Sequence, residues 1–262
     1  MVLKYFLRIL TFFILFLSFH TLQSQNKESL TFQHIEKGIS HSTATILLED
    51  SYGFIWIGTR NGLNRYDGKD FEIFNKTTDG ITGLTHEYIV SLYEDNENLL
   101  ISTNHGLSLY DRSLNLVVPY PFKNEAKKIE SKRFQWVTRL NGYLWLGTEK
   151  DGLFRYQPET GALKHFKLPD DYVKLKSRRV DKIIKVMPLD DERMLVISTY
   201  NILVINKEMD ILSKLQETDE IVTAIPLKKN DFLLGTISGK LIELKINSSL
   251  EFLTKKKDVS WL

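Results

Sequence analysis

Short apolar runs alternate with turn residues along most of this chain. The first clear segment holds four such runs, at residues 44–49, 54–59, 63–66 and 71–74. The turn sequences between them are Asp50-Ser51-Tyr52-Gly53, Asn61-Gly62 and Asp67-Gly68. Asn-Gly and Asp-Gly between apolar runs are strong hairpin signals, because both central residues of a type I′ turn need a positive φ. The pattern therefore predicts four antiparallel strands joined by tight turns, which we call strands a to d.

This segment returns along the chain at nearly regular intervals. A Gly-Thr or Ser-Thr pair marks each copy and begins at residues 58, 102, 147, 198 and 235. Four strands in a repeat of about 40–50 residues are typical of a β-propeller blade. We therefore predict an all-β fold, a β-propeller of four-stranded antiparallel blades with about five repeats. The predicted blades span residues 40–75, 84–122, 132–168, 178–216 and 218–254.

Both ends of the repeat region bear on whether the ring closes. The sequence TFQHI at 31–35 resembles an unpaired strand d, and residues 258–262 resemble the start of a sixth strand a. We therefore expect an incomplete ring, in a natural propeller with more than five blades. A ring that does not close leaves unpaired sheet edges, which favour association. Downstream sensor domains or a partner chain would then complete the propeller.

The first 24 residues have the composition of an export signal. Lys4 and Arg8 precede an apolar run at 9–19, and the chain turns polar up to Ser24. A run of about eleven residues is too short to span a bilayer and suits a signal peptide. We predict a signal peptide at 1–24 and a propeller at 25–262, periplasmic after cleavage or membrane-tethered if the signal stays. We expect no membrane span after the signal.

Charge and composition argue against several kinds of site. The chain has 35 Lys and Arg and 33 Asp and Glu, and two of the basic residues lie in the predicted signal. A neutral remainder gives no electrostatic reason to expect nucleic acid binding. Cysteine is absent, and the histidines lack the spacing of a metal site. We expect no metal, no cofactor and no catalytic residues, although sequence alone cannot place the carboxylate pair of a glycosidase.

Residues that recur in several copies should serve the architecture. We assign this role to Trp56, Gly58, Thr59, Gly62, Trp145, Gly147, Thr148 and Gly152. Each copy also has a Thr at the end of strand b, at 59, 103, 148, 199 and 236, which we expect to hydrogen-bond the backbone of the next turn. The turn at 50–53, followed by Trp56, resembles the Asp-box of sialidase propellers, a turn-stabilising feature.

The segment LLEDSYGFIWIGTRNGLNRYDG, at 47–68, resembles the two-component regulator propeller repeat, and the resemblance extends over about residues 30–255. It implies a periplasmic sensor region of a hybrid histidine kinase. In such proteins two seven-bladed propellers are typically followed by a β-sandwich, a transmembrane helix, a kinase, a receiver and a DNA-binding domain. Many members sense oligosaccharides. None of these later parts is present in this sequence, so kinase activity would belong to a domain absent from it.

Positions that differ between copies are free of the architectural constraint and can carry function. They lie at the b–c corners and in the d–a connections, which we expect on one face. The candidate ligand-binding residues are Arg60, Asn61, His86, Asn104, His105, Glu149, Lys150, Asp151, Tyr200 and Asn201. We expect a sensor module for an oligosaccharide ligand. The alternatives are a scaffold for protein partners, a carbohydrate-active propeller enzyme and a nonfunctional gene fragment.

Overall fold

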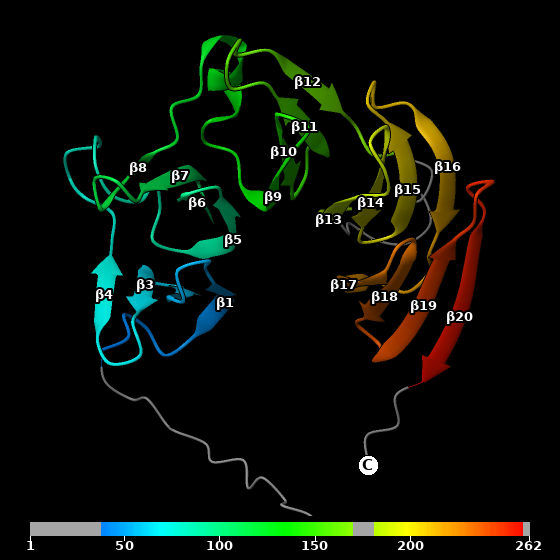
Figure 1. Ribbon diagram of the computed structural model, residues 1–262, viewed down its shortest axis with the longest axis horizontal. Helices are drawn as coiled ribbons and strands as arrows, with labels where there is room; N and C mark the ends of the chain where they lie inside the picture. Colours follow the sequence, from blue (N-terminus) through cyan, green and yellow to red (C-terminus); the bar gives the residue numbers. More distant parts are fainter. Residues whose placement is uncertain (1–37, 170–180, 259–262) are drawn as a thin grey trace, which may run out of the picture. The chain divides into compact units, whose positions relative to one another are not determined.

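The structure is a computed structural model that describes residues 38–169 and 181–258. This part of the chain folds into five four-stranded antiparallel sheets, and its helix content is one short 3₁₀-helix, η1 (Asn124–Ile129) (Figure 1). Within each sheet the strands lie side by side in chain order, so each sheet is a meander of hairpins. The predicted all-β fold of four-stranded antiparallel blades is confirmed.

The strand bounds follow the repeats. The first sheet contains β1 (Ala44–Glu49), β2 (Ile55–Thr59), β3 (Leu63–Tyr66) and β4 (Phe71–Phe74). The second contains β5 (Ile89–Asp95), β6 (Asn98–Thr103), β7 (Gly106–Asp111) and β8 (Leu116–Pro119). The third contains β9 (Phe134–Leu140), β10 (Tyr143–Thr148), β11 (Leu153–Tyr156) and β12 (Leu163–Phe166). The fourth contains β13 (Ile183–Pro188), β14 (Arg193–Ser198), β15 (Asn201–Asn206) and β16 (Ile211–Gln216). The fifth contains β17 (Ile221–Lys228), β18 (Asp231–Thr236), β19 (Lys240–Ile246) and β20 (Phe252–Asp258).

The strand predictions for the first repeat agree with β1 to β4, except that β2 begins one residue later than expected. Gly62 has φ +109°, a backbone conformation that residues with a Cβ rarely adopt, so the second turn favours glycine. Asp258, which the sequence assigned to a sixth repeat, is instead the last residue of β20. The predicted signal peptide at 1–24, the segment at 31–35 and residues 259–262 lie outside the described residues.

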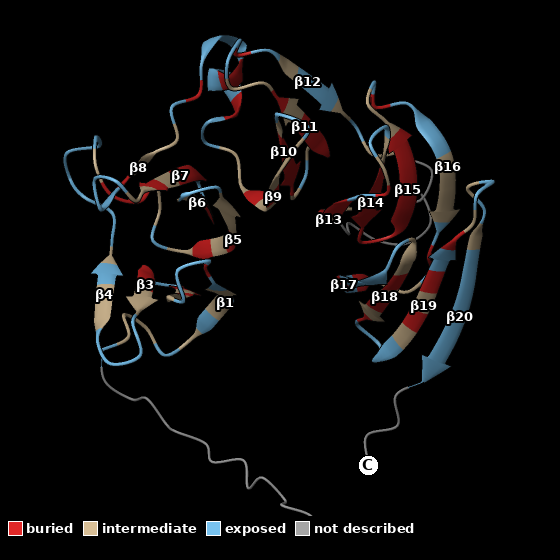
Figure 2. Cartoon of the chain, viewed as in Figure 1, coloured by how far each residue is buried: buried red, intermediate tan, exposed pale blue. Residues whose placement is uncertain are grey.

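Consecutive sheets pack face to face through four buried apolar clusters, one at each junction. Between the first and second sheets, Trp56 is fully buried with Ile89 and Tyr110. Between the third and fourth, Trp145 packs with Ile183. The predicted packing of these indoles between blades is confirmed. Buried residues concentrate along the packed strands, whereas β20 is largely exposed (Figure 2).

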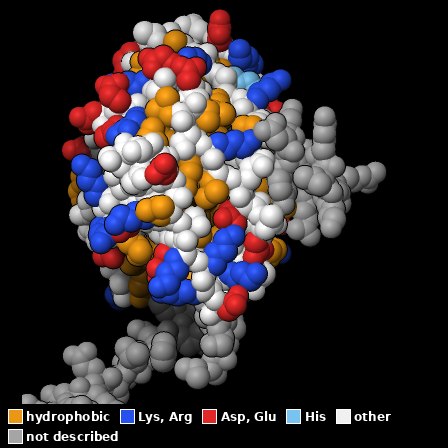
Figure 3. All heavy atoms as spheres, turned by 90° about the vertical axis from the view of Figure 1, so that its right-hand side faces the viewer, with side chains coloured by type: hydrophobic (Ala, Val, Ile, Leu, Met, Phe, Trp, Pro, Cys, Tyr) orange, Lys and Arg blue, Asp and Glu red, His pale blue; other side chains and the backbone are white. Residues whose placement is uncertain are grey.

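No buried cluster of the described residues joins the first sheet to the fifth, so the ring is not closed within them, as expected. The fifth sheet accordingly exposes apolar side chains, among them Val222, Ile225, Leu227 and Leu253, which are 47% to 56% exposed. On the face of the molecule drawn in Figure 3, hydrophobic side chains lie among Lys and Arg and Asp and Glu side chains, without a large field of one sign.

The recurring hydroxyl at the end of strand b holds the b–c corner. Thr59 Oγ1 donates to the carbonyl of Gly62 at 2.8 Å, and Thr103 and Thr148 make the equivalent bonds. In the fourth sheet the prediction for Thr199 is wrong, because Ser198 Oγ donates to the corner carbonyl, 3.1 Å away. Strand pairing shows why: Ile183 lies opposite Ser198, as Ile89 lies opposite Thr103, so the repeat is shifted by one residue. In the fifth sheet Thr236 Oγ1 instead donates to the carboxylate of Asp219.

Candidate functional site

The b–c corners and the d–a connections meet on one face, which we call the corner face. The backbone N–H of Gly62, in the first corner, donates to the carbonyl of Glu87, in the connection to the second sheet, at 2.8 Å. Gly106 N–H makes the same bond to the carbonyl of Lys132 at 3.1 Å. The first and second corners are thereby each tied to the connection that leads into the next sheet. The expectation that these two kinds of loop share a face is therefore correct.

A hollow of about 350 Å³ opens on this face between the second and third sheets. It is lined by Asn104, Ser131, Lys132, Arg133, Thr148, Glu149, Lys150 and Asp151, and we call it the corner hollow. Four of the predicted candidates, Asn104, Glu149, Lys150 and Asp151, are brought together here. A concave site with a few convergent polar groups is the usual form of a small-molecule site.

The charges in the corner hollow are arranged as pairs across two loops. Lys132 Nζ lies 2.7 Å from Asp151 Oδ2, and Arg133 Nη1 lies 3.3 Å from Glu149 Oε2. Arg133 Nε is buried without a hydrogen-bond partner. Lys150 is exposed at the rim. The hollow therefore presents both donors and acceptors, the combination that hydrogen-bonds sugar hydroxyls.

His105 belongs to a neighbouring hollow of about 280 Å³, which shares Ser131 with the first. Its wall is partly apolar, from Leu84, Leu107 and Pro119, and Tyr120 also lines it. Burial raises the pKa of the Tyr120 phenol to about 12. The two hollows together extend the polar corner face toward an apolar and aromatic surface.

The remaining candidates do not line either hollow. Arg60 and Asn61 are exposed at the first corner, and His86 Nδ1 accepts a hydrogen bond from the N–H of Tyr88. Tyr200 and Asn201 are buried, at 6% and 0% exposed. Asn201 Nδ2 donates to Asp181 Oδ2 at 2.6 Å. Sequence reasoning placed these residues at a corner, which is correct, but it could not show that the side chains of the fourth corner turn inward.

Sequence analysis missed three residues of the corner hollow, Ser131, Lys132 and Arg133. They lie just before β9, in the connection equivalent to the one that places His86 and Glu87 just before β5. A signal was available, because the d–a connections were expected on this face and this one carries a Lys-Arg pair directly before strand a. Among the described residues, no group of three or more His, Asp or Glu side chains is arranged to hold a metal ion. No helix in the same part of the chain is long and apolar enough to cross a membrane.

Comparison with known proteins places this architecture. Residues 38–61 match the family model "Two component regulator propeller". Over 48 residues the chain is 35% identical to histidine kinase P4 of Formosa agariphila. The matched segment covers 18% of this chain and 4% of that protein. The chain therefore spans only a small part of this curated relative.

Three solved structures share the fold. The extracellular domain of the hybrid two component system BT3049 from B. thetaiotaomicron matches with a TM-score of 0.67 at 17% identity, over 85% of this chain and 31% of that one. The extracellular domain of the one component system BT4673 from B. thetaiotaomicron matches with a TM-score of 0.57 at 17% identity, over 78% of this chain and 27% of that one. The Cps50 (Swd1) β-propeller domain of Myceliophteria thermophila matches with a TM-score of 0.58 at 11% identity, over 82% of this chain and 69% of that one. Residues 38–61 are therefore similar to the two-component regulator propeller repeat, and the chain shares the propeller fold of these solved structures.

Proposed function

We propose that this chain is the ligand-sensing, extracytoplasmic propeller of a two-component sensor and that it binds an oligosaccharide on its corner face. The observation that carries the proposal is the corner hollow, where copy-specific side chains converge on a scaffold of the regulator type. The similarity to extracellular domains of two-component systems supports the location and the sensory role. Residues 1–24 would export the chain, and kinase activity would belong to a domain outside this sequence.

The chemistry of the corner hollow suits binding without turnover. Lys132 and Arg133 can donate to hydroxyl or ring oxygens, and Glu149 and Asp151 can accept from hydroxyl groups. The two carboxylates are each held by a cation in an ion pair. We therefore assign these carboxylates to ligand binding.

Signalling would be a population shift. A ligand can move an equilibrium between two arrangements only by its difference in affinity for them. The corner hollow lies at the junction of the second and third sheets, so a ligand that bridges Asn104 and Lys150 would favour one packing of these sheets. That packing would be transmitted to whatever follows the propeller, as a coupling free energy between two sites.

The proposal is tested by calorimetric titration of the purified chain with a panel of oligosaccharides. Lys150→Ala and Asn104→Ala should each weaken the binding of any ligand that the parent binds, by about tenfold, because each removes a hydrogen bond at the site. Lys69→Ala is the matched control, since the Lys69 side chain is 87% exposed and lines neither hollow. It should leave the affinity unchanged.

Two results would contradict the proposal. One is a ligand whose affinity is unaffected by both hollow variants, which would place the site elsewhere. The other is cleavage of an oligosaccharide at a rate that Glu149→Gln or Asp151→Asn abolishes, which would favour an enzyme. Saturable binding of a folded protein on this face, without any sugar ligand, would favour the scaffold alternative.

A further inference from the structure

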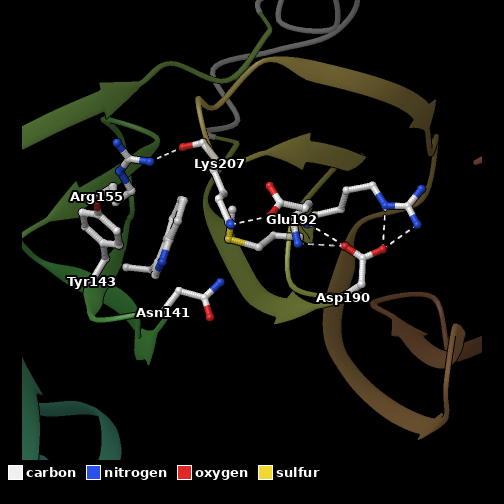
Figure 4. A pocket seen from close by; sticks show the side chains of 9 residues that line it. Asn141, Tyr143, Arg155, Asp190, Glu192 and Lys207 are labelled. Atoms are coloured by element: carbon white, nitrogen blue, oxygen red, sulfur yellow. Dashed lines mark hydrogen bonds and ion pairs between the residues drawn. The ribbon is translucent and has the colours of Figure 1, made fainter.

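A third cavity, of about 220 Å³, lies between the third and fourth sheets (Figure 4). It is lined by Asn141, Tyr143, Trp145, Arg155, Asp190, Glu192, Arg193, Met194 and Lys207, and we call it the turn cavity. Asn141 lies in the β9–β10 turn, and Asp190 and Glu192 lie in the β13–β14 turn. In a meander these a–b turns lie at the opposite end of strand b from the b–c corners. The turn cavity is therefore separate from the corner face.

The junction of the first and second sheets supplies a matched reference for this cavity. Strand pairing places Arg65 opposite Trp56, as it places Arg155 opposite Trp145. In both sheets the guanidinium stacks on an aromatic ring at the start of strand b, 4.8 Å from the centroid of Phe54 and 4.5 Å from that of Tyr143. The two junctions therefore begin from the same Trp-Arg arrangement.

In the reference junction this place is filled by the protein itself. Asp50 Oδ2 accepts from Trp56 Nε1 at 2.7 Å and from Arg112 Nη2 at 2.9 Å, and its side chain is fully buried. Asp50 Oδ1 accepts from the N–H groups of Tyr52 and Phe54. Burial would raise the pKa of this carboxyl, but these hydrogen bonds outweigh it and hold the pKa below its usual value. The junction is thus built around a carboxylate.

The second sheet completes the filling. Tyr110 packs on Trp56 with ring centroids 4.8 Å apart, and its hydroxyl accepts a hydrogen bond from Arg65 Nη1. Asn115 Oδ1 accepts from the same guanidinium nitrogen at 3.2 Å. The Trp-Arg stack of the first sheet is therefore covered from the next sheet by an aromatic ring and an amide.

The junction of the third and fourth sheets lacks these fillers. Asp50 and Phe54 flank the a–b turn of the first sheet, and Leu140 and Tyr143 take these positions in the third sheet. The turn of the third sheet is one residue shorter than that of the first. In the second sheet Tyr110 lies opposite Leu99. At the equivalent position of the fourth sheet, Ile205 lies opposite Met194. A leucine replaces the carboxylate and an isoleucine replaces the phenol. Neither side chain can accept a hydrogen bond, so these two positions supply no acceptor beside the turn cavity.

The two side-chain donors to Asp50 nevertheless have counterparts in this junction. Trp145 Nε1 corresponds to Trp56 Nε1, and its hydrogen bond is a long one, 3.4 Å to the carbonyl of Leu140. Lys207 corresponds to Arg112, because Lys207 follows Ile205 by two residues and Arg112 follows Tyr110 by two residues. Its hydrogen bond to Glu192 raises the pKa of the Lys207 amine, so the side chain stays cationic. Glu192 is a poor substitute for Asp50, because its side chain is 72% exposed and such surface pairs are weak.

We propose that the turn cavity binds a small organic carboxylate, which takes the place that Asp50 occupies in the first junction. Its oxygens would accept from Trp145 Nε1 and Lys207 Nζ, with Glu192 released to solvent. The lining carries three cations, Arg155, Arg193 and Lys207, against the carboxylates of Asp190 and Glu192. One bound carboxylate balances this excess of positive charge. The remainder of a small ligand would lie against the Tyr143 and Met194 side chains, which also line the cavity.

The indole N–H resonances provide a direct test. The ¹⁵N-labelled chain is titrated with sodium acetate and with sodium D-glucuronate, at constant ionic strength maintained with sodium chloride. D-glucose serves as the uncharged match for glucuronate. The Trp145 Nε1–H resonance should shift saturably with at least one carboxylate and not with glucose or chloride. The Trp56 Nε1–H resonance should stay in place, because Asp50 already occupies its acceptor position.

Two variants make the result specific to the cavity. Lys207→Met should weaken the response of Trp145 about tenfold or more, because it removes a charged hydrogen bond. Leu140→Asp should abolish the response, since it places an internal carboxylate where Asp50 stands in the first sheet. If neither carboxylate shifts Trp145 saturably, or if the Lys207→Met chain, still folded by its amide spectrum, responds with unchanged affinity, the proposal is wrong.

Discussion

Gly147 gives a sharp test of how the sheets pack. A Cβ at this position on β10 would lie 2.3 Å from Ile183 Cγ2 and 2.6 Å from Ile183 Cβ, on the first strand of the next sheet. Its backbone is not in the left-handed region, so an alanine would suffer from crowding alone. Overpacking of this kind costs about 1–3 kcal/mol, and the lower entropy of the unfolded alanine chain returns about 0.4–1 kcal/mol. Gly147→Ala should therefore lower the unfolding free energy by about 1–2 kcal/mol.

Gly235 is the matched control, at the same position in the fifth sheet. A Cβ there would meet only Thr223 Cγ2, at 2.9 Å, and no residue of a following sheet. Gly235→Ala should change the free energy of unfolding by less than about 0.5 kcal/mol. The assay is thermal unfolding followed by far-ultraviolet circular dichroism, with midpoints converted at about 2–4 °C per kcal/mol for a chain of this size. Equal shifts for the two variants would refute the claim that crowding against Ile183 of the next sheet is what destabilises Gly147→Ala.

Three further predictions concern the Asp50 carboxylate and the Tyr120 phenol. Asp50→Ala should lower the unfolding free energy by about 3–5 kcal/mol, because it leaves Arg112 and the Trp56 indole without their buried acceptor; thermal melts should show this, and a loss under about 1 kcal/mol would contradict it. Folding lowers the pKa of Asp50, so the stability linked to this shift is fully present above the unfolded value of about 3.9 and is lost as the pH falls through the folded value; the difference between melts of the parent and the variant should therefore narrow in acid, and a constant difference down to pH 2 would argue against a carboxylate effect. The Tyr120 phenol should ionise near pH 12, measured as the difference between alkaline absorbance titrations of the parent and Tyr120→Phe; ionisation near pH 10 would mean that the ring is more open to solvent.

The strands could be predicted because their signals are local. Asn61 and Gly62 fix a turn, and alternation on either side fixes the strands that it joins. The one-residue shift at Ser198 and Thr199 could not be predicted, because two adjacent hydroxyls both suit the corner bond and only pairing with Ile183 decides between them. Local pattern thus determines which strands form, and register between strands depends on tertiary packing.

The corner hollow was predictable in part for a related reason. Asn104 and Lys150 could be placed together because all corners of a meander share one face. Lys132 joins them through a loop after η1, whose path the sequence pattern does not specify. The turn cavity was beyond prediction, because residues from two different sheets line it and the sequence pattern does not specify how those sheets pack.

The most direct test of the central claim, that the corner face binds a sugar ligand without turnover, is an amide-resolved NMR titration of the labelled chain with oligosaccharides. The backbone resonances of Asn104, Lys132 and Lys150 should shift saturably with one member of the panel, and the ligand's own spectrum should remain that of the intact oligosaccharide. Saturable shifts confined to other parts of the molecule, or the appearance of cleaved sugar in the tube, would contradict the account.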